Sequence, residues 1–189
     1  RLWMVPGGRW VDQNRNPGHI MIYENYKWKN LTNSILQAAT NQIAVMDLTG
    51  VAVDKDDATH FWVSSYGTGL YEFKNDTLVN RYTAVNSIMG SAAPNSPDRY
   101  TRVENPTYDS DGVLWVTVAG GIDTTLVAFL PDGTQRGVNF YTGVDQRYVI
   151  NTPGGLLIDH KNPNRKWAIS CRKEPGVILL DDGGTRYNG

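Results

Sequence analysis

A tryptophan inside a short apolar segment recurs along this chain, and this recurrence constrains the fold more than any other feature. The segments read Leu-Trp-Met-Val, Phe-Trp-Val-Ser, Leu-Trp-Val-Thr and Lys-Trp-Ala-Ile, and their tryptophans are Trp3, Trp62, Trp115 and Trp167. Successive tryptophans are 59, 53 and 52 residues apart. A spacing of this size predicts a repeated structural unit rather than one irregular domain.

Each repeat carries the signals of short β-strands separated by polar turns. An apolar segment ends at an aspartate in three repeats (Asp54, Asp109 and Asp159), and the tryptophan strand follows that turn. A second apolar strand is expected at residues 19–23, 70–73, 125–130 and 176–180, and a last strand at residues 26–31, 77–82 and 134–141. Such a unit cannot bury both of its faces alone, so we expect neighbouring units to stack.

The repeats predict an all-β fold, a partial β-propeller of about four blades that are four-stranded antiparallel sheets. We expect blades at residues 1–49, 50–103, 104–153 and 154–189. The first unit has no strand before Leu2 and the last has at most a short fourth strand, so we expect a fragment of a larger propeller. Unpaired edges of the end blades can pair with another chain, so we expect this chain to self-associate.

Composition excludes two classes of partner. The formal net charge is −1, which gives no electrostatic basis for binding nucleic acid. No apolar run approaches the roughly 20 residues that cross a bilayer, so we expect no membrane span in this chain.

The single cysteine, Cys171, excludes an internal disulfide and indicates a small buried hydrophobic residue rather than a nucleophile.

Two stretches resemble the two-component regulator propeller repeat. Residues 109–116, Asp-Ser-Asp-Gly-Val-Leu-Trp-Val, match its first half, and residues 65–74, Ser-Tyr-Gly-Thr-Gly-Leu-Tyr-Glu-Phe-Lys, match its second half. Residues 172–177 depart from the pattern. Within that family, residues 63–74, 82–87, 152–156 and 164–168 resemble the PorZ-like propeller proteins of the type IX secretion system.

The resemblance implies a non-catalytic interaction module of the type IX secretion apparatus, located in the periplasm or at the outer-membrane-associated cell surface. Protein or surface-polysaccharide partners are expected, and no cofactor. The other branch of the family implies an alternative, a periplasmic glycan-sensing propeller of a hybrid two-component system. A sensor predicts a downstream membrane span and a kinase.

Candidate ligand contacts lie in the long connections between strands. Trp10 stands among polar residues and could stack on a sugar ring, or hold its own loop in place. A second candidate surface combines residues of the connection 85–103 with residues of the connection 141–155: Arg99, Tyr100, Arg102, Arg147 and Tyr148. Loops of this length are often functional.

The residue types used in catalysis and metal binding form no recognisable motif. The three histidines (His19, His60 and His160) are spread over separate repeats, and we expect surface histidines with satisfied hydrogen bonds. Asp109 and Asp111 have the spacing of half a calcium loop, but a turn in which aspartate binds its own backbone fits better. We therefore expect no catalytic residues and no metal ligands.

Overall fold

The structure is a computed structural model, and it describes residues 1–8, 15–40, 43–120, 124–138, 153–171 and 175–184. The first blade is a three-stranded antiparallel sheet followed by one short helix. Its elements are β1 (Leu2–Met4), β2 (Ile20–Glu24), β3 (Lys27–Leu31) and α1 (Asn33–Ala39). No helix among the described residues is long and apolar enough to cross a membrane.

The second and third blades have four antiparallel strands each. The second consists of β4 (Leu48–Val53), β5 (His60–Gly67), β6 (Gly69–Lys74) and β7 (Thr77–Tyr82). The third consists of β8 (Thr101–Tyr108), β9 (Leu114–Ala119), β10 (Leu126–Phe129) and β11 (Gln135–Val138). The end of β5 pairs with the start of β8, which joins the two blades edge to edge.

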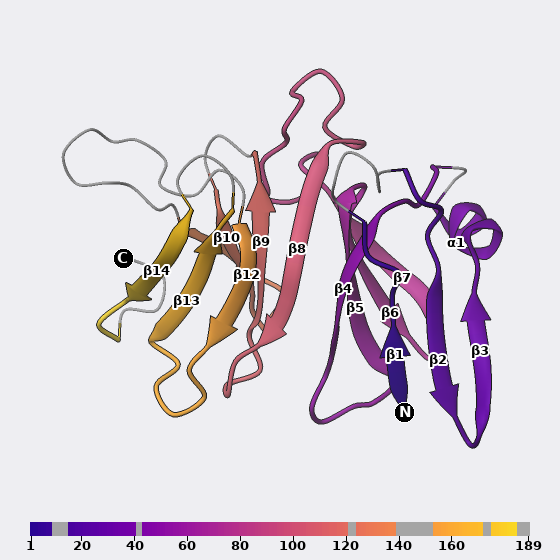
Figure 1. Ribbon diagram of the computed structural model, residues 1–189, viewed down its shortest axis with the longest axis horizontal. Coiled ribbons are helices and arrows are strands. Elements are labelled where there is room, and N and C mark those ends of the chain that lie inside the picture. The colour runs from indigo at the N-terminus through magenta and orange to yellow at the C-terminus, as the bar shows by residue number, and fades with distance from the viewer. Residues whose placement is uncertain (9–14, 41–42, 121–123, 139–152, 172–174, 185–189) are drawn as a thin grey trace.

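The fourth blade is again a three-stranded sheet in the described part of the chain. Its strands are β12 (Pro153–Ile158), β13 (Arg165–Ser170) and β14 (Gly176–Asp181). Figure 1 shows the blades side by side, from β14 at one end to β3 and α1 at the other. The prediction of an all-β partial propeller is confirmed. The division of the chain after residues 49, 103 and 153 stays a prediction.

Hydrophobic cores lie between the blades, as the stacking argument requires. The first two blades share a core that includes Ile20, Ile22 and Phe61. The second and third share a core around Trp62 and Leu114, and the third and fourth share one around Trp115 and Ala168. Each internal blade therefore buries both of its faces, because strand side chains alternate between two neighbouring blades.

The repeat tryptophans pack between neighbouring blades wherever the described chain continues into a further blade. Trp62 and Trp115 are buried, and Trp3 packs with its ring centre 6.0 Å from that of Phe61. Trp167 is 39% exposed because it lies on the outer face of the last blade.

Both long connections are shorter than the sequence interpretation had them. The connection 141–155 does not extend to Gly155, because β12 begins at Pro153. The connection 85–103 does not extend to Val103, because β8 begins at Thr101 and pairs there with Gly67. Arg102 therefore lies in a strand rather than in a loop. The strand could not be read from local sequence because its partner is distant along the chain.

Candidate functional site

The surface predicted from the sequence is only partly described by the structure. Trp10, Arg147 and Tyr148 lie outside the described residues. Arg99 is largely exposed with its guanidinium 3.8 Å from Asp98, and Tyr100 is also exposed. Arg102 lies with its guanidinium carbon 5.1 Å from the centre of the Tyr66 ring. The binding role of this predicted surface stays a prediction.

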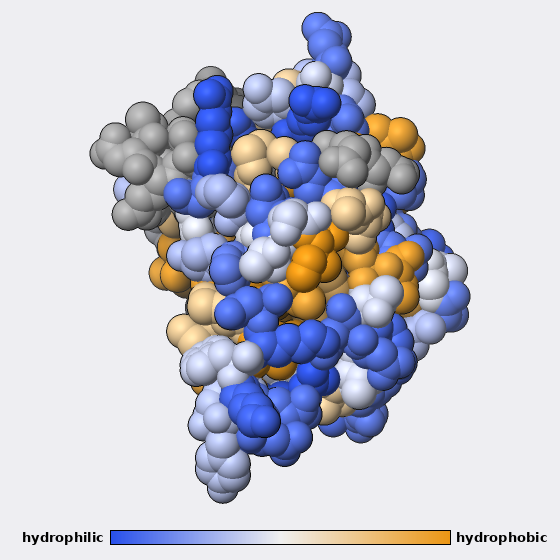
Figure 2. Space-filling model, turned by 90° about the vertical axis from the view of Figure 1, so that its right-hand side faces the viewer, coloured by the Kyte–Doolittle hydropathy of each residue, from blue (hydrophilic) through white to orange (hydrophobic). Residues whose placement is uncertain are grey.

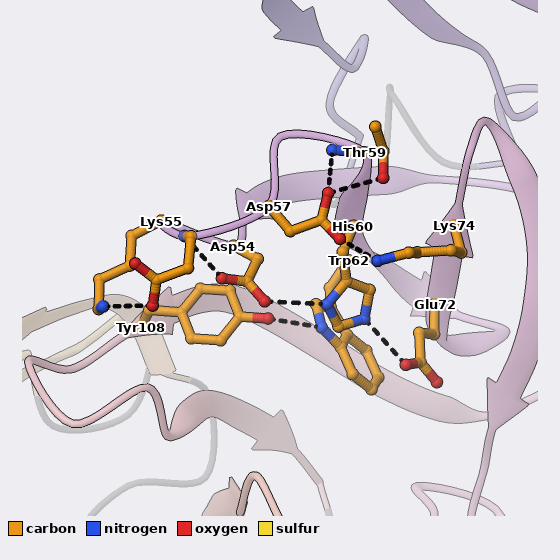
Figure 3. A network of polar contacts seen from close by, with 10 residues as sticks. Asp54, Lys55, Asp57, Thr59, His60, Trp62, Glu72, Lys74 and Tyr108 are labelled. Atoms are coloured by element: carbon orange, nitrogen blue, oxygen red, sulfur yellow. Dashed lines mark hydrogen bonds and ion pairs between the residues drawn. The ribbon is translucent and has the colours of Figure 1, made fainter.

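A cavity of about 270 Å³ lies between the second and third blades, at the end of β8 opposite to Arg102. Polar side chains of the second blade and apolar residues of the third form its walls. The lining residues are Asp54, His60, Trp62, Glu72, Tyr82, Tyr108, Gly112, Leu114, Phe129, Leu130, Pro131 and Gly133. We call this cavity the inter-blade pocket, and Figure 3 shows the polar contacts on its second-blade side.

A tight turn before β5 places the acidic side of the pocket. The Asp54 carboxylate accepts a hydrogen bond from the Asp56 backbone N–H (2.9 Å), and the backbone N–H of Asp54 donates to the His60 carbonyl (3.0 Å). This is the aspartate turn expected from the sequence. Asp57 stabilises the same turn through the N–H and hydroxyl of Thr59. The turn thereby fixes Asp54 beside the first residue of β5.

His60 bridges two carboxylates. Its Nδ1 lies 3.1 Å from Asp54 Oδ2, and its Nε2 lies 2.9 Å from Glu72 Oε1 (Figure 3). Only the doubly protonated ring can donate to both carboxylates, since a neutral imidazole has one N–H. Even with that positive charge, the two carboxylates leave this group with a net charge of −1. The prediction of a satisfied histidine is confirmed for His60, but its location in a pocket was not foreseen.

Aromatic side chains cover the wall next to these charges. The Trp62 indole N–H donates to the Tyr108 hydroxyl at 2.9 Å. The Trp62 ring centre lies 5.6 Å from those of Tyr82 and Phe129, and these two lie 5.2 Å apart. The Tyr82 hydroxyl contacts Glu72 Oε2 at 3.2 Å. The pocket therefore joins aromatic surface to carboxylate oxygens.

The pKa values of the lining residues follow from these contacts. Burial and the nearby Glu72 carboxylate raise the pKa of Tyr82 to about 12. Burial, with Asp54 and Glu72 as further causes, raises the pKa of Tyr108 despite the Trp62 hydrogen bond. Burial opposes ionisation of Asp54, but its bonds to the Asp56 backbone and to His60 hold its pKa below the usual value. Both tyrosines thus experience the negative charge of the pocket.

The arrangement suits binding more than proton transfer. Both ring nitrogens of His60 face carboxylates, so neither has a free lone pair aimed into the cavity. In the described part of the chain no three His, Cys, Asp or Glu side chains are placed to hold a metal ion. The alternation of His60 and Trp62 places both on one face of β5, and Glu72 pairs with Trp62 across the sheet. This pattern indicates a polar strand face, but it does not show which blade covers that face.

Comparison with known proteins identifies the fold. No protein-family model matches the chain, and no curated protein sequence matches it. The chain is similar in structure to PorZ, described as an essential bacterial surface component of the type IX secretion system of Porphyromonas gingivalis. The TM-score is 0.82 at 23% sequence identity, over 98% of this chain and 24% of that one. The chain thus spans about a quarter of the length of PorZ and shares the fold of that part.

Proposed function

We propose that this chain is a non-catalytic β-propeller interaction module and a PorZ-like component of the type IX secretion apparatus. The observation that supports the proposal is the structural likeness to PorZ over 98% of the chain. The sequence segments that resemble PorZ-like proteins include residues 63–74, which form most of β5 and all of β6. The inferred location is the periplasm or the outer-membrane-associated cell surface, with protein or polysaccharide partners.

The lack of a catalytic role is part of this proposal. It is supported by the inter-blade pocket, where His60 is held between Asp54 and Glu72 with both nitrogens engaged. A general base needs a free nitrogen within reach of its substrate. The pocket offers fixed charges and aromatic surface, which serve recognition.

The alternative is a glycan-sensing propeller of a hybrid two-component system. Residues 65–74 and 109–116, which resemble the repeat of that family, favour it. A sensor and a secretion component differ in what fails when the protein is lost. The first controls a transcriptional response to a glycan, and the second is needed for export.

The test is an in-frame deletion of the coding region in the bacterium that carries it. We expect proteins exported by the type IX apparatus to disappear from the cell surface and to return when the wild-type chain is restored within its parent protein. Unchanged export with loss of a glycan-induced transcriptional response would replace this proposal with the sensor. Unchanged export and unchanged transcription would contradict both.

A further inference from the structure

The blades meet through one recurring contact between a repeat tryptophan and the residue that precedes the next repeat tryptophan. Trp3 contacts Phe61 at 6.0 Å between ring centres. At the interface of the third and fourth blades, the Lys166 ammonium lies 4.3 Å from the centre of the Trp115 ring. Phe61 and Lys166 each stand one residue before a repeat tryptophan, so they occupy equivalent places.

The contact of Lys166 shows that a positively charged group can be bound on the repeat tryptophan of the preceding blade. Its ammonium also donates to Asp182 Oδ2 (3.0 Å) and to the Pro163 carbonyl (2.8 Å), and both charged side chains are about 1% exposed. An ammonium over an indole ring is attracted by the negative face of the ring, and the attraction grows when water is excluded. The chain thus already binds one lysine ammonium beside a repeat tryptophan.

The inter-blade pocket lies at the equivalent position between the second and third blades, beside Trp62. Leu114 precedes Trp115 and pairs with Phe129, as Lys166 precedes Trp167 and pairs with Leu180. Leucine is shorter than lysine and carries no charge, and a cavity remains beside Trp62. No lysine or arginine is among the described residues that line the cavity, whereas Asp54 and Glu72 are.

We propose that the inter-blade pocket binds the ammonium group of a lysine side chain presented by a partner protein. Glu72 and Asp54 supply the negative charge, and Trp62, Tyr82 and Phe129 supply the aromatic wall. This proposal rests on the proposed function in one respect only, namely that the partner is a protein. Binding of the side chain itself follows from the pocket and can be measured without any secretion apparatus.

The experiment uses two probes that differ only in the ammonium group. Nα-acetyl-lysine amide and Nα-acetyl-norleucine amide are titrated separately into the ¹⁵N-labelled chain. The signal followed is the indole N–H of Trp62, which is identified by its loss in Trp62→Phe. We expect a saturable shift with the lysine probe that weakens as salt is added, and none with the norleucine probe.

Variants of the pocket decide whether the signal comes from the proposed contacts. Glu72→Gln and Tyr82→Leu are each expected to raise the dissociation constant of the lysine probe by about fivefold or more. Asp56→Asn removes a carboxylate of the same turn that does not line the pocket, and it should leave the dissociation constant unchanged.

Leu114→Lys tests the equivalence with Lys166 most sharply. The new ammonium should reach the pocket and abolish the shift caused by the lysine probe. Equal shifts with both probes, or a lysine-probe response that survives Glu72→Gln, Tyr82→Leu and Leu114→Lys, would overturn the proposal. Loss of type IX export without any probe binding would overturn this inference and leave the proposed function standing.

Discussion

The Lys166 ammonium is buried between the Trp115 ring and the Asp182 carboxylate, where the third and fourth blades meet. A buried ion pair whose partners are both satisfied is tolerated, but removal of one partner leaves an uncompensated charge. We expect Lys166→Met to lower the free energy of unfolding by about 3–5 kcal/mol in urea denaturation. The double variant Lys166→Met with Asp182→Asn should recover part of that loss.

The neighbouring Arg165 provides the matched control. It forms an ion pair of similar length (2.9 Å) with Asp181, but the two side chains are 49% and 40% exposed. Exposed pairs contribute about 0–1 kcal/mol. If Arg165→Met destabilised the chain as much as Lys166→Met does, burial would not be what makes the Lys166 contact important.

Gly69 sits at the start of β6 in a conformation that a side chain cannot adopt without strain. Its φ is +96°, and a Cβ atom there would lie 2.1 Å from the Tyr82 carbonyl oxygen. We expect Gly69→Ala to cost about 3 kcal/mol or more, because strain and a backbone clash act together. Gly183→Ala, at φ +58° with no atom within 4 Å, should cost only about 1 kcal/mol. Equal losses in urea denaturation would contradict the clash.

Asp76 joins the second blade to the first. Its carboxylate lies 2.8 Å from both the Arg1 guanidinium and the Lys29 ammonium. Burial opposes ionisation, but these two cations hold the pKa of Asp76 below 3.8. The stabilisation is therefore complete above pH 3.8 and is lost as the pH falls through the lowered pKa.

The variant Asp76→Asn should accordingly be less stable than the wild type by about 2 kcal/mol at pH 6. The difference should vanish well below pH 3.8, where the wild-type carboxyl is also neutral. Urea denaturation of both proteins across this range measures it. A difference that stayed constant with pH would show that the charge of Asp76 contributes nothing.

The outer faces of the end blades carry exposed hydrophobic side chains. On the fourth blade these are Leu157, Trp167, Ile169, Val177 and Leu179. The side that carries β3 and α1 also gathers hydrophobic side chains at its centre, surrounded by hydrophilic ones (Figure 2). Exposed hydrophobic residues of the first blade and α1 are Leu2, Met4, Tyr26, Trp28 and Ile35.

These faces support the prediction that the chain self-associates. We expect Trp167→Glu to shift sedimentation toward the monomer, because it places a charge on the face that a blade would cover. Val85→Glu changes a more exposed hydrophobic residue in the connection before β8 and serves as the control. A wild-type chain that remained monomeric at all concentrations would contradict the prediction.

Much of the fold could be predicted from the sequence, since local pattern determines it. The alternation of side chains around Trp62 and Trp115 predicts two strands, and the structure confirms both. The aspartate turns at Asp54 and Asp109 are confirmed as well. The sequence also predicts a short helix at residues 35–40, with Asn33 or Ser34 as its cap. It begins instead at Asn33, after Thr32, without a side-chain capping bond.

The pocket could not be predicted because it depends on contacts between segments far apart in sequence. Trp62 and Tyr108 are 46 residues apart, and their hydrogen bond exists only because two blades stack. Lys166 likewise resembles a surface residue in sequence, whereas the preceding blade buries it. Local patterns specify strands and turns, but they do not show which charges meet between blades.

The role in type IX secretion is tested most directly by cross-linking in intact cells that produce the tagged wild-type chain within its parent protein. Proteins of the type IX apparatus are expected among the cross-linked species, and Glu72→Gln should reduce them while Asp56→Asn does not. Cross-linking to a histidine kinase, or to no envelope protein at all, would contradict a role in secretion.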